Sequence, residues 1–268
     1  MRLPPITSDL VRRLQGVWVK ERRTRHGGSM EQPGNPSGIE MRTFGGALAV
    51  RSRRLPSSPW LNRCINLTAD DLPHVEEILK FYREAGLTGW LEIAPGTSSP
   101  ELFAALARGG AHQTGFHTVT YGLPTTEVPP PAPGVAVRPV EREELDRFLE
   151  AHMIGFGAGP EIAPGFRFFF GLPDWHLYLA TVDGVLAGTA ILCTYDGVGY
   201  MAAASTLPEW RGRGVQTALL HHRIAEAARM GCDLLMGQCD FGTSSHRNQQ
   251  ACGLFTAYTK AVWVTSPA

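Results

Sequence analysis

The stretch PEWRGRGVQTALL, residues 208–220, decides the fold, because it joins a predicted strand to a predicted helix through a turn rich in glycine and arginine. Glycine lets the backbone approach a ligand closely. The start of a helix presents unpaired N–H groups and the positive end of the helix dipole. Arg211 and Arg213 can add charge-assisted hydrogen bonds. The stretch therefore predicts a cradle for a phosphate group.

Other interpretations of this stretch are open. A Walker A loop needs Gly-Lys-Ser/Thr, which this sequence does not have there. Gly212 and Gly214 fit a dinucleotide-binding fingerprint, and Asp233 lies near the distance for a ribose contact, but Thr217 fills the third glycine position. The stretch also follows a series of hairpins late in the chain, which disfavours that fingerprint. A plain strand-to-helix turn without a ligand is the remaining alternative.

The sequence around this turn predicts a mixed arrangement of helices and strands. The Asp-Gly pairs at residues 183–184 and 196–197 lie between apolar runs, which is the strongest short-range signal for a hairpin. The predicted elements are helix 141–153, strands 176–182, 185–194 and 198–206, helix 214–230, strand 234–238, helix 243–252, and two short strands at 255–258 and 261–265.

The N-terminal half predicts a similar succession. Its elements are strand 48–51, helix 69–85, strand 90–93, helix 99–108 and strand 116–121, preceded by a loop at 26–38. Four prolines fall within residues 129–133, which favours a semi-rigid linker. We therefore expect two copies of one unit, with a first domain at 1–127, a linker at 128–134 and a second domain at 135–268.

Two motifs resemble a known family. Arg211-x-x-Gly214-x-Gln216 is similar to the Q/R-x-x-G-x-G/A pyrophosphate loop of the GCN5-related N-acetyltransferases (GNAT), with Gln216 in place of Gly or Ala. Downstream, residues 242–255 (GTSSHRNQQACGLF) resemble the next motif of the family, a helix that follows the fifth strand. The spacing of the two motifs and the order of elements agree with the family over about residues 135–265.

The resemblance implies an α+β (mixed α/β) fold of two tandem GNAT-like domains, each with a mixed, mostly antiparallel central sheet flanked by helices. It implies acetyl-coenzyme A as the cofactor. The residues that it assigns to the pyrophosphate are Arg211, Gly212, Arg213, Gly214, Val215, Gln216 and Thr217. The pantetheine arm would contact the backbone at Ser205 and Thr206 and be flanked by Ser245 and Asn248. The N-terminal copy has acidic residues at its helix start, which would repel a pyrophosphate, so we expect it to be degenerate.

The implied reaction is transfer of an acetyl group to a primary amine by direct attack in a ternary complex. Many relatives donate a proton from a Tyr four residues before the glycine that ends the second motif, but this chain has Gln249 there. Tyr258 is the nearest substitute as an acid, although a core tyrosine fits the pattern as well. Asp240 and Glu209 are the candidates for the general base, and a water relay is also open.

Composition limits the other functions. The chain has 25 basic and 25 acidic residues, so no net charge attracts nucleic acid, and we expect neither nucleic-acid nor membrane partners. The odd number of cysteines and the scattered histidines predict a cytoplasmic protein without a metal site. The expected acceptor is a small-molecule or peptide amine, and a homodimer is possible. Alternatives are a non-catalytic acyl-coenzyme A-binding or regulatory module and a tandem aminoacyl transferase that uses charged tRNA.

Overall fold

The computed structural model describes residues 2–157 and 166–265. Packing divides the chain into two compact units. One consists of Thr120–Thr256 with Met1–Leu3, and we call it the C-terminal unit. The other consists of Pro4–Val119 with Ala257–Ala268, and we call it the N-terminal unit.

The C-terminal unit is built on an antiparallel meander that continues into one parallel pair. β6 (Val135–Pro139), β7 (Trp175–Val182), β8 (Val185–Tyr195) and β9 (Val198–Met201) pair in succession, and β9 then pairs in parallel with β11 (Leu234–Cys239). Asp183 and Asp196 have φ of 50° and 52°, and the glycine after each also has a positive φ. These are type I′ turns, as the two Asp-Gly pairs predict.

The strand expected at 198–206 is interrupted. After Met201 the chain makes a tight bend in which the N–H of Ala202 donates to the carbonyl of Tyr200, and β10 (Ala204–Thr206) then resumes pairing with β8. Within the described residues β9 pairs with both β8 and β11, whereas β10 pairs with β8 alone. The two neighbouring strands therefore part beyond Met201, and one edge of β10 is left open.

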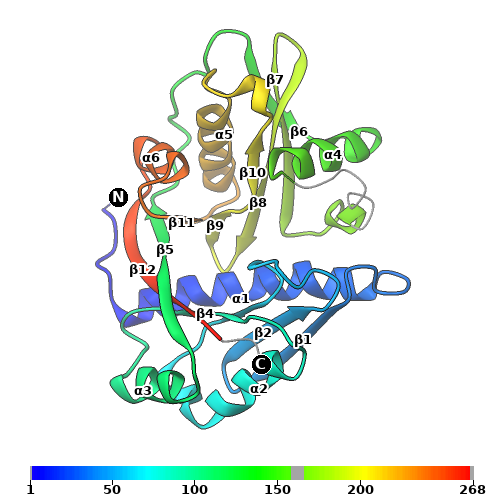
Figure 1. The fold of residues 1–268 in the computed structure, drawn as a ribbon. Helices are drawn as coiled ribbons and strands as arrows, with labels where there is room; N and C mark the ends of the chain where they lie inside the picture. Colours follow the sequence, from blue (N-terminus) through cyan, green and yellow to red (C-terminus); the bar gives the residue numbers. More distant parts are fainter. Residues whose placement is uncertain (1, 158–165, 266–268) are drawn as a thin grey trace. The chain divides into compact units, whose positions relative to one another are not determined.

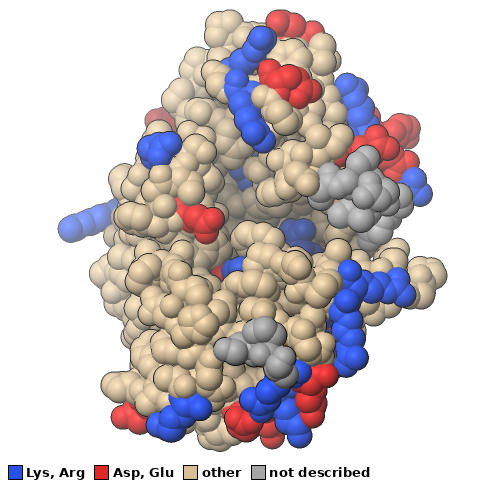
Figure 2. Space-filling model, in the orientation of Figure 1, with Lys and Arg blue, Asp and Glu red and all other residues tan. Residues whose placement is uncertain are grey.

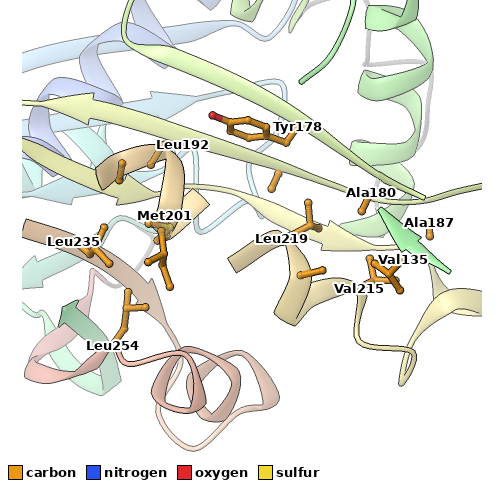
Figure 3. Close-up of a cluster of buried hydrophobic side chains, with 14 of the residues drawn as sticks. Val135, Tyr178, Ala180, Ala187, Leu192, Met201, Val215, Leu219, Leu235 and Leu254 are labelled. Carbon is orange, nitrogen blue, oxygen red and sulfur yellow. The ribbon is translucent and has the colours of Figure 1, made fainter. Parts of the chain in front are cut away.

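Helices cover both faces of this sheet (Figure 1). They are α4 (Leu145–Gly155), α5 (Val215–Arg229) and α6 (Ser244–Ala251). Figure 3 shows the apolar cluster in which strand residues such as Tyr178, Leu192 and Met201 meet Val215 and Leu219 of α5. α5 begins directly after the glycine-rich turn, so this buried cluster fixes the helix start that the sequence singles out.

The N-terminal unit also has antiparallel pairings that lead into one parallel pair. β1 (Ile39–Phe44), β2 (Ala47–Ser52) and β3 (Arg63–Ile65) are antiparallel, β3 is parallel to β4 (Trp90–Ile93), and β4 is antiparallel to β12 (Phe255–Val264). The other elements are α1 (Ser8–Glu31), the 3-10 helix η1 (Ala69–His74), α2 (Val75–Arg83), α3 (Pro100–Arg108) and β5 (His112–Gly122). The last residues of β5, from Thr120, and the first two of β12 belong to the C-terminal unit. The predicted fold class, mixed and mostly antiparallel, is confirmed.

Three local predictions need correction. The loop expected at 26–38 is wrong for its first part, since α1 continues to Glu31 through two glycines. The helix expected at 69–85 begins as a 3-10 turn, because Pro73 interrupts the α-helical hydrogen-bond pattern there. The α-helix that follows ends at Arg83. The two short strands expected after residue 255 are one strand, β12, because Lys260 is paired inside the unit instead of forming a polar turn.

Candidate functional site

The start of α5 has the geometry of an anion cradle. Gly214 is the N-cap residue and has a left-handed backbone (φ 79°, ψ 2°), and no side chain among the described residues caps the helix there. The N–H groups of the first turn are therefore left without an intrahelical acceptor. A Cβ at Gly214 would lie 3.0 Å from Cβ of Ala132, so the position has little space for a side chain as well as a backbone suited to glycine.

The residues around Gly214 combine open space with positive charge. Gly212 also has a left-handed backbone (φ 78°), and a Cβ there would meet no atom within 4 Å. Arg211 and Arg213 are exposed, and the Arg213 guanidinium lies 5.0 Å from the centre of the Trp210 ring. Val215 is buried, whereas Gln216 and Thr217 are half-buried. The side chain of Gln216, which departs from the family pattern, leaves the backbone donors in place.

β10 presents its backbone to the open edge of the sheet at alternate residues. The bonds Ile191 N–H to Ala203 O and Leu207 N–H to Ala187 O set the register with β8. By the alternation of an antiparallel pair, Ser205 turns its backbone toward β8, while Ala204 and Thr206 turn theirs toward the gap. The side chain of Ser205 therefore lies on the α4 face, and the backbones that face the gap are those of Thr206 and of Ala204, a residue that the sequence did not single out.

A buried polar atom also lies at this edge. The hydroxyl oxygen of Thr206 is shielded from solvent and has no hydrogen-bond partner in the described part of the chain. Buried hydroxyl groups are usually satisfied, because an unpaired one costs free energy. Together with the uncapped helix start, this is the arrangement that a ligand with polar groups along an extended arm would complete.

α6 supplies the other predicted contacts. Ser245 and Asn248 are half-buried on this short helix, and Thr243 caps it by accepting from the N–H of His246 at 3.3 Å. Gln249, which replaces the family's tyrosine, is buried: its amide accepts from the hydroxyl of Thr120 and donates to Ser245 at 3.3 Å. The side chain at 249 is thus part of the packing of the unit.

The loop after β11 is fixed by a histidine that the sequence reasoning did not single out. The N–H of Gly242 donates to Nδ1 of His246 at 3.1 Å, and Nε2 of the same ring lies 2.9 Å from the Thr256 hydroxyl. The first bond makes Nδ1 an acceptor, so Nε2 carries the proton. This buried ring holds the loop that carries Asp240, whose carboxylate is exposed to solvent.

The three predicted catalytic side chains lie in different surroundings. Asp240 and Glu209 are exposed and belong to the C-terminal unit, Glu209 in the short 3-10 turn Pro208–Trp210 before the cradle. Tyr258 belongs to the N-terminal unit, where its hydroxyl accepts from Nε2 of Gln15 at 2.7 Å. Burial raises the pKa of Tyr258. The higher pKa makes this phenol a weaker proton donor.

The described residues carry neither a cluster of metal-ligating side chains nor a helix suited to a membrane. No group of three or more His, Cys, Asp or Glu side chains there is arranged to hold a metal ion. None of the helices in residues 2–157 and 166–265 combines the length and the apolar character needed to cross a membrane. Basic and acidic side chains are interspersed on the face shown in Figure 2.

Comparison with known proteins finds similarity over part of the sequence and in the fold. Residues 144–258 match the model of the Acetyltransferase (GNAT) family. No curated protein matches the sequence. Among solved structures, a GCN5-related N-acetyltransferase from Kribbella flavida has a TM-score of 0.64 at 19% identity, covering 91% of this chain and 96% of that one.

A second similar structure has a tandem organisation by its own description. It is a tandem GNAT protein from the clavulanic acid biosynthesis pathway, with a TM-score of 0.61 at 15% identity, covering 98% of this chain and 97% of that one. At such identities the likeness concerns the fold alone. Residues 144–258, which include the cradle and α6, thus match the GNAT family model, and the fold of the chain is similar to that of GNAT proteins.

Proposed function

We propose that the protein is an N-acetyltransferase that moves an acetyl group from acetyl-coenzyme A to a primary amine by direct attack in a ternary complex. The observation that carries the proposal is the uncapped start of α5 at Gly214, next to the open edge of β10. A helix start of this kind binds anionic phosphate groups through its N–H groups and its dipole. The acceptor is a small-molecule or peptide amine.

Each residue of the site has a role in this proposal. The N–H groups of Val215, Gln216 and Thr217 bind the pyrophosphate, with Arg211 and Arg213 adding positive charge. The pantetheine arm lies along the backbone of Ala204 and Thr206 and is flanked by Ser245 and Asn248. When bound, acetyl-coenzyme A supplies the activated acetyl thioester.

An amine with an ordinary pKa near 10 is protonated at pH 7, so a base must take its proton before it can act as a nucleophile. Asp240 and Glu209 are exposed carboxylates on the two loops that flank the open strand edge, and either can accept that proton directly or through water. Tyr258, a buried tyrosine that follows the second motif, is the proposed proton donor to the departing thiolate.

The binding step is tested by isothermal titration of acetyl-coenzyme A into the wild type and into Gly214→Glu. The substitution places a negative side chain at a left-handed position 3.0 Å from Ala132. The wild type is expected to bind at micromolar strength, and the variant is expected to fold without binding. Gly231→Glu is the matched control, because Gly231 has a φ of 76° and lies just beyond the other end of α5.

The outcomes separate the possibilities. Loss of binding in Gly214→Glu with retention in Gly231→Glu supports the cradle, and an amine screen then follows. If neither the wild type nor the control binds, the turn is structural and the acetyltransferase proposal is wrong. Equal binding by all three proteins would place the cofactor elsewhere.

A non-catalytic acyl-coenzyme A-binding module is the second candidate. The specific observation in its favour is that Gln249 stands at the usual acid position and is committed to hydrogen bonds with Thr120 and Ser245. Tight cofactor binding with negligible turnover over a broad panel of amines would favour this module over the enzyme.

We also propose that the N-terminal unit is a degenerate copy of the same fold. Its strand-to-helix turn holds a carboxylate of its own: Asp71 accepts from the N–H of Gly46 at 2.7 Å and from the N–H of Thr68 at 2.9 Å. These donors are therefore already paired with a negative charge. Titration should give one cofactor per chain, and Gly214→Glu should leave no residual binding.

A further inference from the structure

A series of buried hydrogen bonds links α4 to β10, the strand with one open edge. Nδ1 of His152 lies 2.8 Å from the Thr189 hydroxyl, and that hydroxyl lies 3.0 Å from the Ser205 hydroxyl. The three side chains come from α4, β8 and β10 and are between 0% and 5% exposed. Polar groups buried to this degree are retained only when they are mutually satisfied, so the chain of bonds defines one arrangement of the three elements.

The histidine at one end of the chain has little freedom to move. Its ring is stacked on Phe148, with the centroids 5.3 Å apart and the planes 19° from parallel. Phe156 packs edge-on against the other side at 5.0 Å. A ring held between two aromatic side chains keeps Nδ1 aimed at Thr189, and through Thr189 at Ser205.

β10 has few backbone partners to hold it in place. It is three residues long, it follows the bend at Ala202, and in the described residues only β8 pairs with it. Its neighbour β9 is held on both sides, by β8 and β11. Strand segments with few partners open easily, so β10 would fluctuate about its edge without contacts from another element.

Steric contact from the same helix acts on the same residue. Gly155 ends α4 directly over Ser205, and a Cβ at that glycine would lie 2.3 Å from Oγ and 2.4 Å from Cβ of Ser205. α4 therefore approaches β10 as closely as backbone allows. The hydrogen-bonded chain and the glycine contact converge on Ser205, whose neighbours Ala204 and Thr206 turn their backbones toward the gap.

We propose that His152, Thr189 and Gly155 are positioning residues that hold β10 through Ser205, so that the backbones of Ala204 and Thr206 are preorganised for the pantetheine arm of the cofactor. The proposal rests on the proposed function for the identity of the ligand. Its structural part, the ordering of β10 by α4, does not depend on any ligand.

Two probes separate positioning from general stability. Acetyl-coenzyme A uses both the cradle and β10, whereas 3′-phospho-ADP lacks the pantetheine arm and uses the cradle alone. Thr189→Val keeps the shape of the side chain and removes its hydroxyl. We expect this variant to bind acetyl-coenzyme A about 5- to 10-fold more weakly, the equivalent of one hydrogen bond, and to bind 3′-phospho-ADP within about 2-fold of the wild type.

Thr189→Ser is the conservative control, because it restores the hydroxyl, and we expect it to recover most of the lost affinity. Gly155→Ala should weaken acetyl-coenzyme A selectively, as Thr189→Val does, because its methyl group displaces Ser205. Unchanged acetyl-coenzyme A affinity in Thr189→Val, or an equal loss for both probes, would overturn the proposal.

Amide hydrogen exchange of the ligand-free protein makes the test independent of binding. Thr189→Val should raise the exchange rate at Ser205, whose N–H faces β8, while the amides of β7 keep their wild-type rates. If the wild type binds neither probe, the proposed function fails, but faster exchange confined to β10 would still support the positioning role. Equal rates at Ser205 in both proteins would refute that role.

Discussion

At the scale of single residues, the two arginines of the cradle are open to a direct test. Arg211 is exposed. It is the C-cap residue of the preceding 3-10 turn and has an extended backbone just before Gly212. Arg211→Ala should weaken acetyl-coenzyme A binding by about 10- to 100-fold at low salt, since hydrogen bonds to charged groups contribute about 1.5–3 kcal/mol. Isothermal titration at two salt concentrations measures this, and the deficit should shrink as salt rises.

Arg229→Ala is the control for the loss of one positive charge from the same helix. Arg229 lies at the far end of α5 and is paired with Glu226. Equal losses in the two variants would mean that the arginines act through overall charge and that Arg211 does not touch the cofactor.

The residue scale also marks how far the sequence could predict the site. The positive φ of Gly212 and Gly214 follows from the glycine pattern, because a strand-to-helix turn with an open N-terminus needs such positions. Which residues of β10 turn their backbone groups toward the gap could not be predicted. The bend at Ala202 shifts which residues face the gap, so Ala204 joins Thr206 while Ser205 turns to α4. Nothing local in the sequence marks that bend.

At the scale of elements, α1 is the element that the sequence concealed. Its last turns contain Gly27 and Gly28, which are typical of a loop, yet the helix continues to Glu31. The reason is tertiary: the helix buries Leu14 and Val17 in its first half, and it buries His26 and Ser29 on either side of the two glycines, and this packing outweighs the weak helix propensity of glycine.

Substitution of Gly27 tests the helical end of α1. A Cβ at Gly27 would meet no atom within 4 Å, so Gly27→Ala should raise the free energy of unfolding by about 0.5–1 kcal/mol. Urea denaturation measures the difference. Gly34→Ala, just beyond the helix with a φ of 73°, is the matched control and should be destabilising by about 1 kcal/mol. If Gly27→Ala is also destabilising, residues 26–31 form the loop that the sequence suggests.

At the scale of the whole molecule, the N-terminal unit is organised around one buried carboxylate. Glu92 on β4 is paired with Arg63 of β3 and Lys260 of β12, accepts from Nε1 of Trp18 at 3.2 Å, and lies 2.9 Å from Nδ1 of His117 on β5. Lys260 and Arg63, together with the hydrogen bond from His117, hold the pKa of Glu92 well below its ordinary value despite its burial. Removal of a single partner would leave charge buried without compensation.

Such a network could not be predicted from local patterns. Glu92 and Lys260 are 168 positions apart, and each lies in a strand where sequence alternation alone indicates an ordinary polar residue. Their contact also explains why β12 continues through Lys260. The order of elements and the cradle follow from short-range signals, whereas the final strand follows from a long-range ion pair. The predicted division into domains at 128–134 remains a prediction.

The ion pair makes stability depend on pH in a defined direction. Burial lowers the pKa of Lys260 to about 8, against about 10.4 in an unfolded chain. Below pH 8 Lys260 is protonated in both the folded and the unfolded state, so the full cost of burying its charge lowers the free energy of unfolding. Between pH 8 and 10.4 the unfolded chain binds more protons than the folded protein, so this lysine makes the free energy of unfolding rise with pH.

Comparison with Lys260→Met isolates that contribution, because the other titrating groups are common to both proteins. From pH 8 to pH 10 the stability of the wild type relative to the variant should increase by about 2 kcal/mol in urea denaturation. Lys80→Met, which removes an exposed lysine paired with Glu84, is the control for the loss of one lysine from the same unit. Parallel pH curves for the wild type and Lys260→Met would mean that Lys260 keeps an ordinary pKa. In that case Glu92 would offset nearly the whole cost of burying the charge, and the charge on Lys260 would neither raise nor lower the stability of the N-terminal unit in this range.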